Sequence, residues 1–243
     1  LWSQIGQDID GEAAGDNSGY SVSMNGDGNI MAIGAPFNDG SGITGYATGH
    51  VRVYENIGGS WIQIGQDIDG EANGDDSGYG TSISLSNDGN ILAVGANNND
   101  GNGNNAGHVR VYENVGGSWI QIGQDIDGEA SNDLSGLSVS LSSDGNTVAI
   151  GAPGNDGIGT NAGHVRIYNY NGAVWTQLGL DIDGEAAGDH SGWSVSLSSD
   201  GNIVAIGAKE NDGNGNNSGH VRIYNYNGSS WNQLGNDIDG NSS

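Results

Sequence analysis

The sequence contains no cysteine and only 2 prolines among its 243 residues. Without cysteine, neither a disulfide framework nor a thiolate site for metal or redox chemistry can form. The fold must therefore be held by packing, with or without bound ions. No run of 18 or more apolar residues is present either, so the sequence predicts no membrane insertion. Because the chain begins at Leu1, we expect any secretion signal to have been removed or to lie outside this sequence.

Positive charge is scarce in this chain. It has 5 lysines and arginines against 30 aspartates and glutamates, which gives a formal net charge of -25 at pH 7. Such a surface repels the phosphates of nucleic acids and anionic lipids, so we predict neither as a partner. Cations in a salty or calcium-containing medium would screen the self-repulsion of an acidic fold. The charge therefore favours an extracellular or cell-surface location.

Glycine is abundant, with 47 residues, and asparagine, serine and aspartate crowd around it in most connecting segments. These residues favour turns, because glycine tolerates positive φ and short polar side chains bond to nearby backbone. Apolar residues make up 34% of the chain and are gathered in short runs. We therefore predict an all-β protein with many short strands.

Tryptophan and histidine mark an internal repeat of 56 to 59 residues. The tryptophans are Trp2, Trp61, Trp119, Trp175 and Trp231, and the histidines are His50, His108, His164 and His220. A period of this length suits a four-stranded blade of a β-propeller with roomy loops, whereas solenoid repeats are shorter. We predict one repeat domain over residues 1–243, with blades at about residues 11–69, 70–127, 128–183 and 184–239.

Each repeat is expected to form four antiparallel strands. In the first repeat, residues 19–24 alternate small polar with apolar side chains, as in a strand with two unlike faces. Asp27-Gly28 then predicts a hairpin turn, and the apolar run at residues 30–35 predicts a central strand covered on both faces. Residues 50–54 and 61–64 are the third and fourth strands. Because one repeat cannot cover both sides of its central strand, neighbouring repeats must stack face to face.

A count of the predicted strands leaves one in excess. Fourth-strand sequences occur at both Trp2 and Trp231, so residues 1–10 are predicted to form an extra N-terminal outer strand. In a closed four-bladed ring, one terminal strand hangs free or pairs with a neighbouring molecule. Self-association into a polymer or fibril is therefore one hypothesis, and a chain that forms part of a longer ring or array is the other.

Four segments of the first repeat resemble the FG-GAP repeat of integrin α-subunit propellers and related bacterial surface proteins. They are residues 18–23 (Ser-Gly-Tyr-Ser-Val-Ser), 27–29 (Asp-Gly-Asn), 33–36 (Ile-Gly-Ala-Pro) and 49–54 (Gly-His-Val-Arg-Val-Tyr). The resemblance covers essentially the whole chain, although Asn97 and Lys209 replace the proline in two repeats. It implies a β-propeller fold with an extracellular adhesion or scaffold role. The family's calcium loop between the first two strands is shortened here to turns such as residues 142–146, so calcium is not expected there.

A repeated acidic run, in the connection from the fourth strand to the next first strand, is the candidate metal site. Oxygen-rich loops with a glycine suit calcium, which takes six to eight hard ligands at flexible geometry. The sequence thus predicts calcium as a cofactor, and capping of turns or pairing with arginine is the alternative. The candidate ligands are Asp8, Asp10, Glu12, Asp16, Asp67, Asp69, Glu71, Asp75, Asp125, Asp127, Glu129, Asp133, Asp181, Asp183, Glu185 and Asp189.

The basic residues favour a packing role over catalysis. One arginine occupies the same third-strand position in every repeat, and the Asp-Ile-Asp segments are its expected partners. These arginines are Arg52, Arg110, Arg166 and Arg222. The histidine that opens each third strand has no second histidine nearby in sequence, which favours a structural role over metal ligation. His190, Trp193 and Lys209 are among the few residues that break the fourfold pattern.

The repetition argues against an enzyme, which usually needs one asymmetric site. We expect a non-enzymatic extracellular module with a structural or adhesive function. Its expected partners are copies of itself, other surface proteins or glycans. The alternative is a multivalent lectin that binds sugars in pockets between the blades and gains avidity from repetition.

Overall fold

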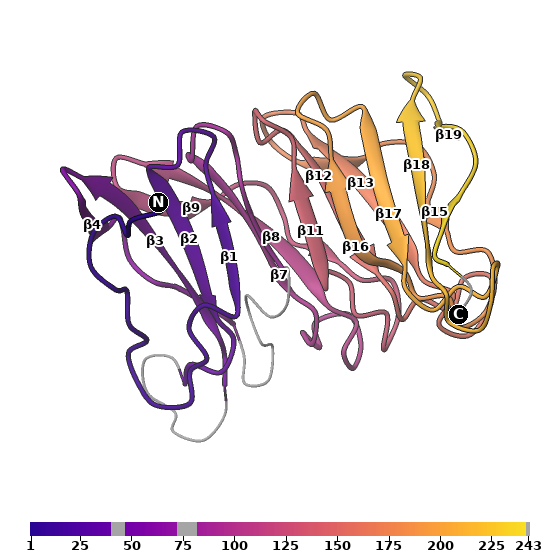
Figure 1. Ribbon diagram of the computed structural model, residues 1–243, viewed down its shortest axis with the longest axis horizontal. Helices are drawn as coiled ribbons and strands as arrows, with labels where there is room; N and C mark the ends of the chain where they lie inside the picture. The colour runs from indigo at the N-terminus through magenta and orange to yellow at the C-terminus, as the bar shows by residue number, and fades with distance from the viewer. Residues whose placement is uncertain (40–46, 72–81, 242–243) are drawn as a thin grey trace.

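The computed structural model describes residues 1–39, 47–71 and 82–241. The described residues form 20 short strands, and no helix among them has the length and apolar character needed to cross a membrane. The strands make up four antiparallel sheets that follow one another along the chain (Figure 1). The predicted all-β class is confirmed.

Each sheet contains one sequence repeat and is called a blade below. In blade 1, β1 (Ser21–Met24) pairs with β2 (Ile30–Ala35), β2 pairs with β3 (His50–Ile57), and β3 pairs with both β4 (Ser60–Gln63) and β5 (Ile68–Asp69). Blade 2 contains β6 (Ile83–Leu85), β7 (Ile91–Ala96), β8 (His108–Val115), β9 (Ser118–Gln121) and β10 (Ile126–Asp127). Blade 3 contains β11 (Ser138–Leu141), β12 (Thr147–Ala152), β13 (His164–Tyr170), β14 (Trp175–Gln177) and β15 (Ile182–Asp183). Blade 4 contains β16 (Ser191–Leu197), β17 (Ile203–Ala208), β18 (His220–Tyr226), β19 (Trp231–Gln233) and β20 (Ile238–Asp239).

The outer strand of each blade is divided into two segments, which the sequence does not predict. The Asp-Ile-Asp segment was assigned to a connecting loop, but Ile68 and Asp69 return to β3 and pair with its first two residues. Gly65 has a φ of +80°, a conformation that lets the chain turn away from β3 after β4 and come back. The same two-residue strand closes blades 2, 3 and 4.

Residues 1–10 form no strand, contrary to the expected extra outer strand. An outer strand needs the third strand of its own blade as a pairing partner, and none lies beside these residues. They run along the edge of blade 1, where the indole Nε1 of Trp61 donates a hydrogen bond to Ile5 O at 3.0 Å. Trp2 itself is fully exposed.

The Asp-Gly turns between the first and second strands form as predicted. In blade 3, Asp144 Oδ1 accepts bonds from the Ser142 hydroxyl at 2.6 Å and from Asn146 N at 3.0 Å. Gly145 has a φ of +72°, which residues with a side chain rarely adopt. Burial opposes ionisation of Asp144, but these hydrogen bonds outweigh it and lower the pKa of the carboxyl. The ionised side chain therefore holds the turn that aligns β11 with β12.

Each blade has two apolar faces. The face toward the preceding blade, called the leading face, carries Val139 and Trp175 in blade 3. The face toward the following blade, called the trailing face, carries Ala149, Val165 and Ile167 in blade 3. Each trailing face packs on the next leading face, so the three core clusters lie between blades. The central strands are therefore covered on both sides, as their continuous apolar sequence predicts.

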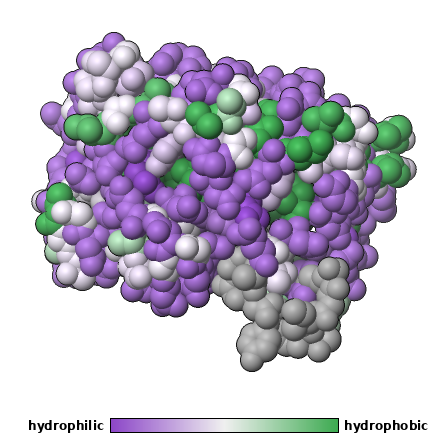
Figure 2. All heavy atoms as spheres, turned by 180° about the vertical axis from the view of Figure 1, so that it is seen from behind, coloured by the Kyte–Doolittle hydropathy of each residue, from purple (hydrophilic) through white to green (hydrophobic). Residues whose placement is uncertain are grey.

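The four blades stack in an open array, with blade 1 at one end and blade 4 at the other (Figure 1). The first strands of neighbouring blades, β1, β6, β11 and β16, contact one another along the array. Three cores join four blades, so among the described residues the leading face of blade 1 and the trailing face of blade 4 have no neighbouring blade. Seen from behind, the surface is mainly hydrophilic, with hydrophobic residues in small separate groups (Figure 2).

Candidate metal-binding clusters

Each blade brings one glutamate, one histidine and one aspartate together. Within each group, one carboxylate oxygen from each acid and one imidazole nitrogen all lie within 4.8 Å of one another. We call the groups clusters 1 to 4, in chain order. They are Glu12, His50 and Asp67; Glu71, His108 and Asp125; Glu129, His164 and Asp181; and Glu185, His220 and Asp237.

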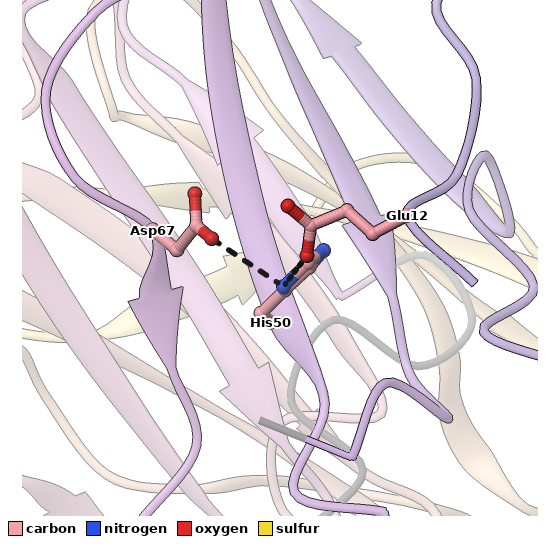
Figure 3. A group of neighbouring side chains, drawn as sticks. All are labelled: Glu12, His50 and Asp67. Carbon is pink, nitrogen blue, oxygen red and sulfur yellow. Dashed lines mark ion pairs between the residues drawn. The ribbon is translucent and has the colours of Figure 1, made fainter. Parts of the chain in front are cut away.

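The side chains of cluster 1 come from separate parts of the fold and converge on the histidine ring (Figure 3). His50 opens β3, Asp67 lies between β4 and β5, and Glu12 lies in the segment that leads to β1. His50 Nδ1 is 3.8 Å from Glu12 Oε2 and 4.0 Å from Asp67 Oδ2. The Gln63 amide donates to Asp67 Oδ1 at 2.6 Å, so Oδ2 is the oxygen that faces the ring.

The histidines of the clusters are buried, whereas the glutamates are exposed. Burial lowers the pKa of His50 and His164 below the ordinary value of 6.5, although the neighbouring carboxylates oppose the shift. Both rings are therefore neutral at pH 7 and keep one nitrogen lone pair. One imidazole nitrogen and two carboxylate oxygens form a donor set that can bind a divalent metal ion.

An arginine adjoins each cluster and is its main cation. Arg166 Nη1 is 3.5 Å from Glu129 Oε1, and its Nη2 donates at 2.6 Å to the backbone carbonyl of Asp127 in the preceding blade. Arg110 donates to both carboxylate oxygens of Asp125 at 3.1 Å. The expected pairing of the arginines with the Asp-Ile-Asp segments is thus present, partly through backbone carbonyls. Arg166 and Arg222 tie their blades to the preceding ones through the carbonyls of Asp127 and Asp183. All four arginines balance part of the carboxylate charge.

The structure brings one part of the predicted acidic set into the clusters. These residues are Glu12, Asp67, Glu71, Asp125, Glu129, Asp181 and Glu185. Asp237 completes cluster 4 but is not among the predicted ligands, because the last acidic run has Asn241 where the other repeats have glutamate. The sequence favours a structural role for the histidines, and the structure places them beside the acids. The period that histidines and acids share is the sequence signal for this proximity.

A second part of the predicted set caps loops and lies outside the clusters. Asp133 is buried, and its Oδ2 accepts hydrogen bonds from Ala130 N at 2.9 Å and from the Asn155 amide at 3.2 Å. Asp16 and Asp189 accept equivalent bonds. The carboxylates of these three aspartates cap turns, which is the alternative that the sequence left open. Asp75 lies outside the described residues.

The remaining candidates lie within the acidic runs but away from the clusters. Asp69, Asp127 and Asp183 end β5, β10 and β15 with exposed side chains. The carbonyl of Asp10 accepts a bond from Arg52 at 2.9 Å, and the Asp8 carboxylate accepts one from Gln4 at 2.8 Å. None of these five joins a cluster within the described part of the chain.

Comparison with known proteins identifies the repeat and the fold. A family model described as FG-GAP repeat matches residues 181–224. No curated protein matches the chain. Among solved structures, the periplasmic gluconolactonase PpgL of Pseudomonas aeruginosa is 18% identical, with a TM-score of 0.60 over 93% of this chain. Hydrazine synthase of Kuenenia stuttgartiensis is 16% identical, with a TM-score of 0.52 over 91%. The β-propeller domain of the Trilobed protease from Pyrococcus furiosus is 9% identical, with a TM-score of 0.51 over 90%.

The chain spans 58%, 56% and 57% of the lengths of these three proteins, respectively. Identities this low show a common fold and carry no activity from one protein to another. The matched residues run from the end of blade 3 to β18 in blade 4, and the other blades repeat their sequence pattern. The chain is thus an open array of four β-propeller blades that contains an FG-GAP repeat.

Proposed function

We propose that this chain is a non-enzymatic structural or adhesive module of the cell surface or extracellular space, and that it associates with copies of itself. The observation that carries the proposal is the repetition of clusters 1 to 4, each beside an arginine. Polar groups that recur in every blade stabilise the array alike along its length, whereas catalysis usually rests on one asymmetric site. The net charge of -25 suits a medium that contains salt and divalent cations.

The residues that break the fourfold pattern bind one another. The Lys209 ammonium lies 3.3 Å from the centre of the Trp193 ring and 3.1 Å from Glu210 Oε1. His190 Nδ1 is 3.3 Å from Glu210 Oε2. This network pairs the charged groups and covers one face of the tryptophan, which supports a role in surface structure.

Cells that produce the protein provide the direct test of this proposal. Antibodies against the chain should label unpermeabilised cells, or the material between them, under the electron microscope. Label confined to the cell interior would contradict the proposal. The purified chain should also hydrolyse a gluconolactone no faster than buffer does, although a gluconolactonase shares its fold.

We expect calcium to bind clusters 1 to 4 and to strengthen the acidic junctions. Carboxylate oxygens are the donors that calcium prefers, and one arginine per cluster balances only part of their charge. At a hundredfold excess over its Kd, an ion that binds one site of the native chain raises the free energy of unfolding by about 2.7 kcal/mol. Calorimetric titration should give four ions per chain, one for each cluster, and a chelator should lower the melting temperature.

Two variants show whether the ion binds in the clusters. Glu129→Gln removes a donor of cluster 3 and should reduce the number of bound ions by one. Asp183→Asn, which lies outside the clusters, should leave that number unchanged. Zinc is titrated in parallel, because imidazole nitrogen is a ligand that zinc prefers. Zinc binding without calcium binding would mean that the clusters are zinc sites. A melting curve that neither ion changes would contradict a metal site in the clusters.

A sugar-binding role is the second candidate, and a pocket between blades 3 and 4 favours it. At the two preceding junctions, Gln66 and Gln124 donate to the backbone carbonyls of Trp119 and Trp175 at 2.8 and 2.9 Å. Leu180 replaces this glutamine and is 85% exposed. A pocket of about 320 Å³ opens there.

The lining of this pocket combines groups that bind sugars. Trp231 and Tyr224 offer ring surface, while Asp181 and Asp183 offer acceptors for hydroxyl groups. If a glycan array shows binding, Leu180→Gln should abolish it, because the amide would restore the bond to Trp231 O and close the pocket. Val174→Gln, on the exposed hairpin of the same blade, should keep the binding. An array without any bound glycan would remove this candidate.

A further inference from the structure

The trailing face of blade 4 is an uncovered copy of a surface that is buried in blade 3. Val221 is 36% exposed, whereas its counterpart Val165 is 0% exposed. Ile238 is 58% exposed, and its counterpart Ile182 is 6% exposed. The difference arises because blade 4 covers the trailing face of blade 3. The same kind of blade would cover the exposed face.

The leading face of blade 1 is the complementary surface. Val22 is 62% exposed, whereas Ile83 at the same position in blade 2 is 6% exposed. Met24 is 51% exposed, and its counterpart Leu85 is 8% exposed. The two ends of the array therefore carry the two halves of an interface that already forms three times between blades.

Hydrogen bonds set the register at the internal junctions. Leu141 N donates to Ser84 Oγ at 3.0 Å, and Leu197 N donates to Ser140 Oγ at 2.9 Å. The acceptor position of this series is Ser196 in blade 4, and the donor position is Met24 in blade 1. The exposed ends thus present the acceptor and the donor of one more bond in this series.

A second series of hydrogen bonds joins the turns between first and second strands. Asn87 N donates to Ser143 O at 2.9 Å, and Ser143 N donates to Ser199 O at 2.8 Å. The next bond in the series would join Ser199 N of blade 4 to Gly26 O of a following blade 1. Two independent series therefore predict the same relative placement of the two ends.

In blades 3 and 4, a short segment at the start of the first strand inserts into the preceding blade. In blade 4, Ser191 N donates to Ala162 O at 2.9 Å, and the backbone has φ values of 53° at His190 and 84° at Gly192. Blade 1 has the same conformation, with φ values of 54° at Asn17 and 91° at Gly19. We call residues 17–19 the docking segment. Its shape is already that of the inserted segments.

Blade 4 has a pocket of about 380 Å³ at the place where such a segment would insert. Gly207 and Gly219 line it together with Val221. They are the counterparts of Gly151 and Gly163 in blade 3, where an added Cβ would overlap backbone oxygens of the inserted segment of blade 4. The pocket therefore has the glycine lining that close backbone approach requires.

We propose that two copies of this chain dock head to tail, with the leading face of blade 1 and residues 17–19 of one copy on the trailing face of blade 4 of the other. The inference rests on the proposed structural role and gives its self-association a defined interface. The contact joins two different faces, so it closes into a ring or continues as a filament, according to the rotation between copies.

Residues 1–10 occupy the outer part of this interface and move aside on docking. Ile5 O accepts the bond from the Trp61 indole, as Leu178 O accepts the bond from the Trp231 indole at an internal junction. In the docked pair, Leu234 takes the place of Ile5. Displacement is easy, because residues 1–10 have no strand pairing and their side chains are mostly exposed.

The test is the molecular mass of the 243-residue chain in solution over a range of concentrations. Each copy carries a net charge of -25, so the measurement is made at about 0.5 M sodium chloride, where the screening length is well below the roughly 8 Å of physiological salt. Sedimentation should show a mass that rises with concentration to that of two or more chains. Dilution into low salt should reverse the rise.

Three single variants locate the contact. Gly207→Val fills the blade 4 pocket. Within one chain, the atom nearest to its new Cβ is the Ser194 hydroxyl oxygen, which can rotate away, so we expect the fold to be kept. Val22→Asp places a carboxylate on the leading face of blade 1. Each should shift association to at least tenfold higher concentration. Ile120→Asp, at a position on the outer strand β9 that is 51% exposed, should associate as the parent chain does.

Mixing the two docking variants distinguishes head-to-tail contact from any other. Each variant keeps one intact end, so an equal mixture should form a complex of two chains that grows no further. A mixture that stays monomeric while the parent associates would overturn the inference. If the parent associates and neither variant weakens the association, the inference is also overturned. Self-association, and with it the proposed function, would then stand. A parent chain that remains monomeric would overturn both the inference and the self-association in the proposed function. Surface labelling of cells tests the proposed location and structural role separately.

Discussion

Replacing Trp175 by alanine should lower the free energy of unfolding by about 3–5 kcal/mol, whereas the same replacement at Trp2 should change it by less than about 0.5 kcal/mol. Trp175 is 4% exposed in the core between blades 2 and 3. Its indole Nε1 donates to Ile122 O at 3.0 Å, and its ring centre lies 5.1 Å from that of Tyr170. Alanine would leave a cavity and an unpaired carbonyl, while the side chain of Trp2 is fully exposed.

The free energy of unfolding of both variants is measured by circular dichroism in increasing urea. Fluorescence is less suitable, because each variant lacks one of the fluorescent tryptophans. Trp61 gives an intermediate case, since its ring is only partly buried but its Nε1 donates to Ile5 O. The order of destabilisation should therefore be Trp175, Trp61, Trp2. Equal destabilisation at Trp175 and Trp2 would contradict the packing of blades through their leading and trailing faces.

The features of single blades could be predicted because each depends on residues close in the chain. The turn at Asp144 needs a glycine for positive φ and short polar neighbours as hydrogen-bond donors, and all lie within five residues. The strand Thr147–Ala152 is recognisable because both of its faces are apolar. Stacking of blades then follows, since a strand covered on both sides needs two neighbours.

The clusters could be predicted only in part, because they depend on pairing between distant segments. Asp181 reaches His164 through the two-residue strand β15, which pairs with β13. A strand this short has no recognisable periodicity of its own. The sequence showed acids and histidines with one shared period, but it did not show that they meet. It also placed Asp133 among the ligands, although burial and backbone donors give that carboxylate a structural role.

Position within the array is a property that no single repeat encodes. Val22 and Ile83 occupy the same place in similar repeats, yet one is exposed and the other is buried. The difference comes from the neighbouring blade and not from the local sequence. Identical residues in different blades therefore provide matched pairs, in which the chemistry of a substitution stays constant and only the neighbour changes.

Gly151 and Gly207 form such a pair, and replacing each by alanine should have unequal effects. A Cβ on Gly151 would overlap the backbone oxygen of Gly192 in blade 4. Backbone cannot rotate away as a side chain can, so blade 4 must shift against blade 3. Gly151→Ala should lower the free energy of unfolding by roughly 1–3 kcal/mol, the usual range for an overpacked core.

Gly207→Ala should be nearly neutral in the isolated chain, because its Cβ meets chiefly the Ser194 hydroxyl, which can rotate away. Replacing glycine even restricts the unfolded chain, which offsets part of the contact. Urea unfolding of both variants at low protein concentration and low salt makes the comparison free of association. Equal losses would mean that a further blade covers Gly207 even there. If the difference between the two losses becomes smaller as protein concentration and salt rise, another copy comes to occupy the trailing face of blade 4.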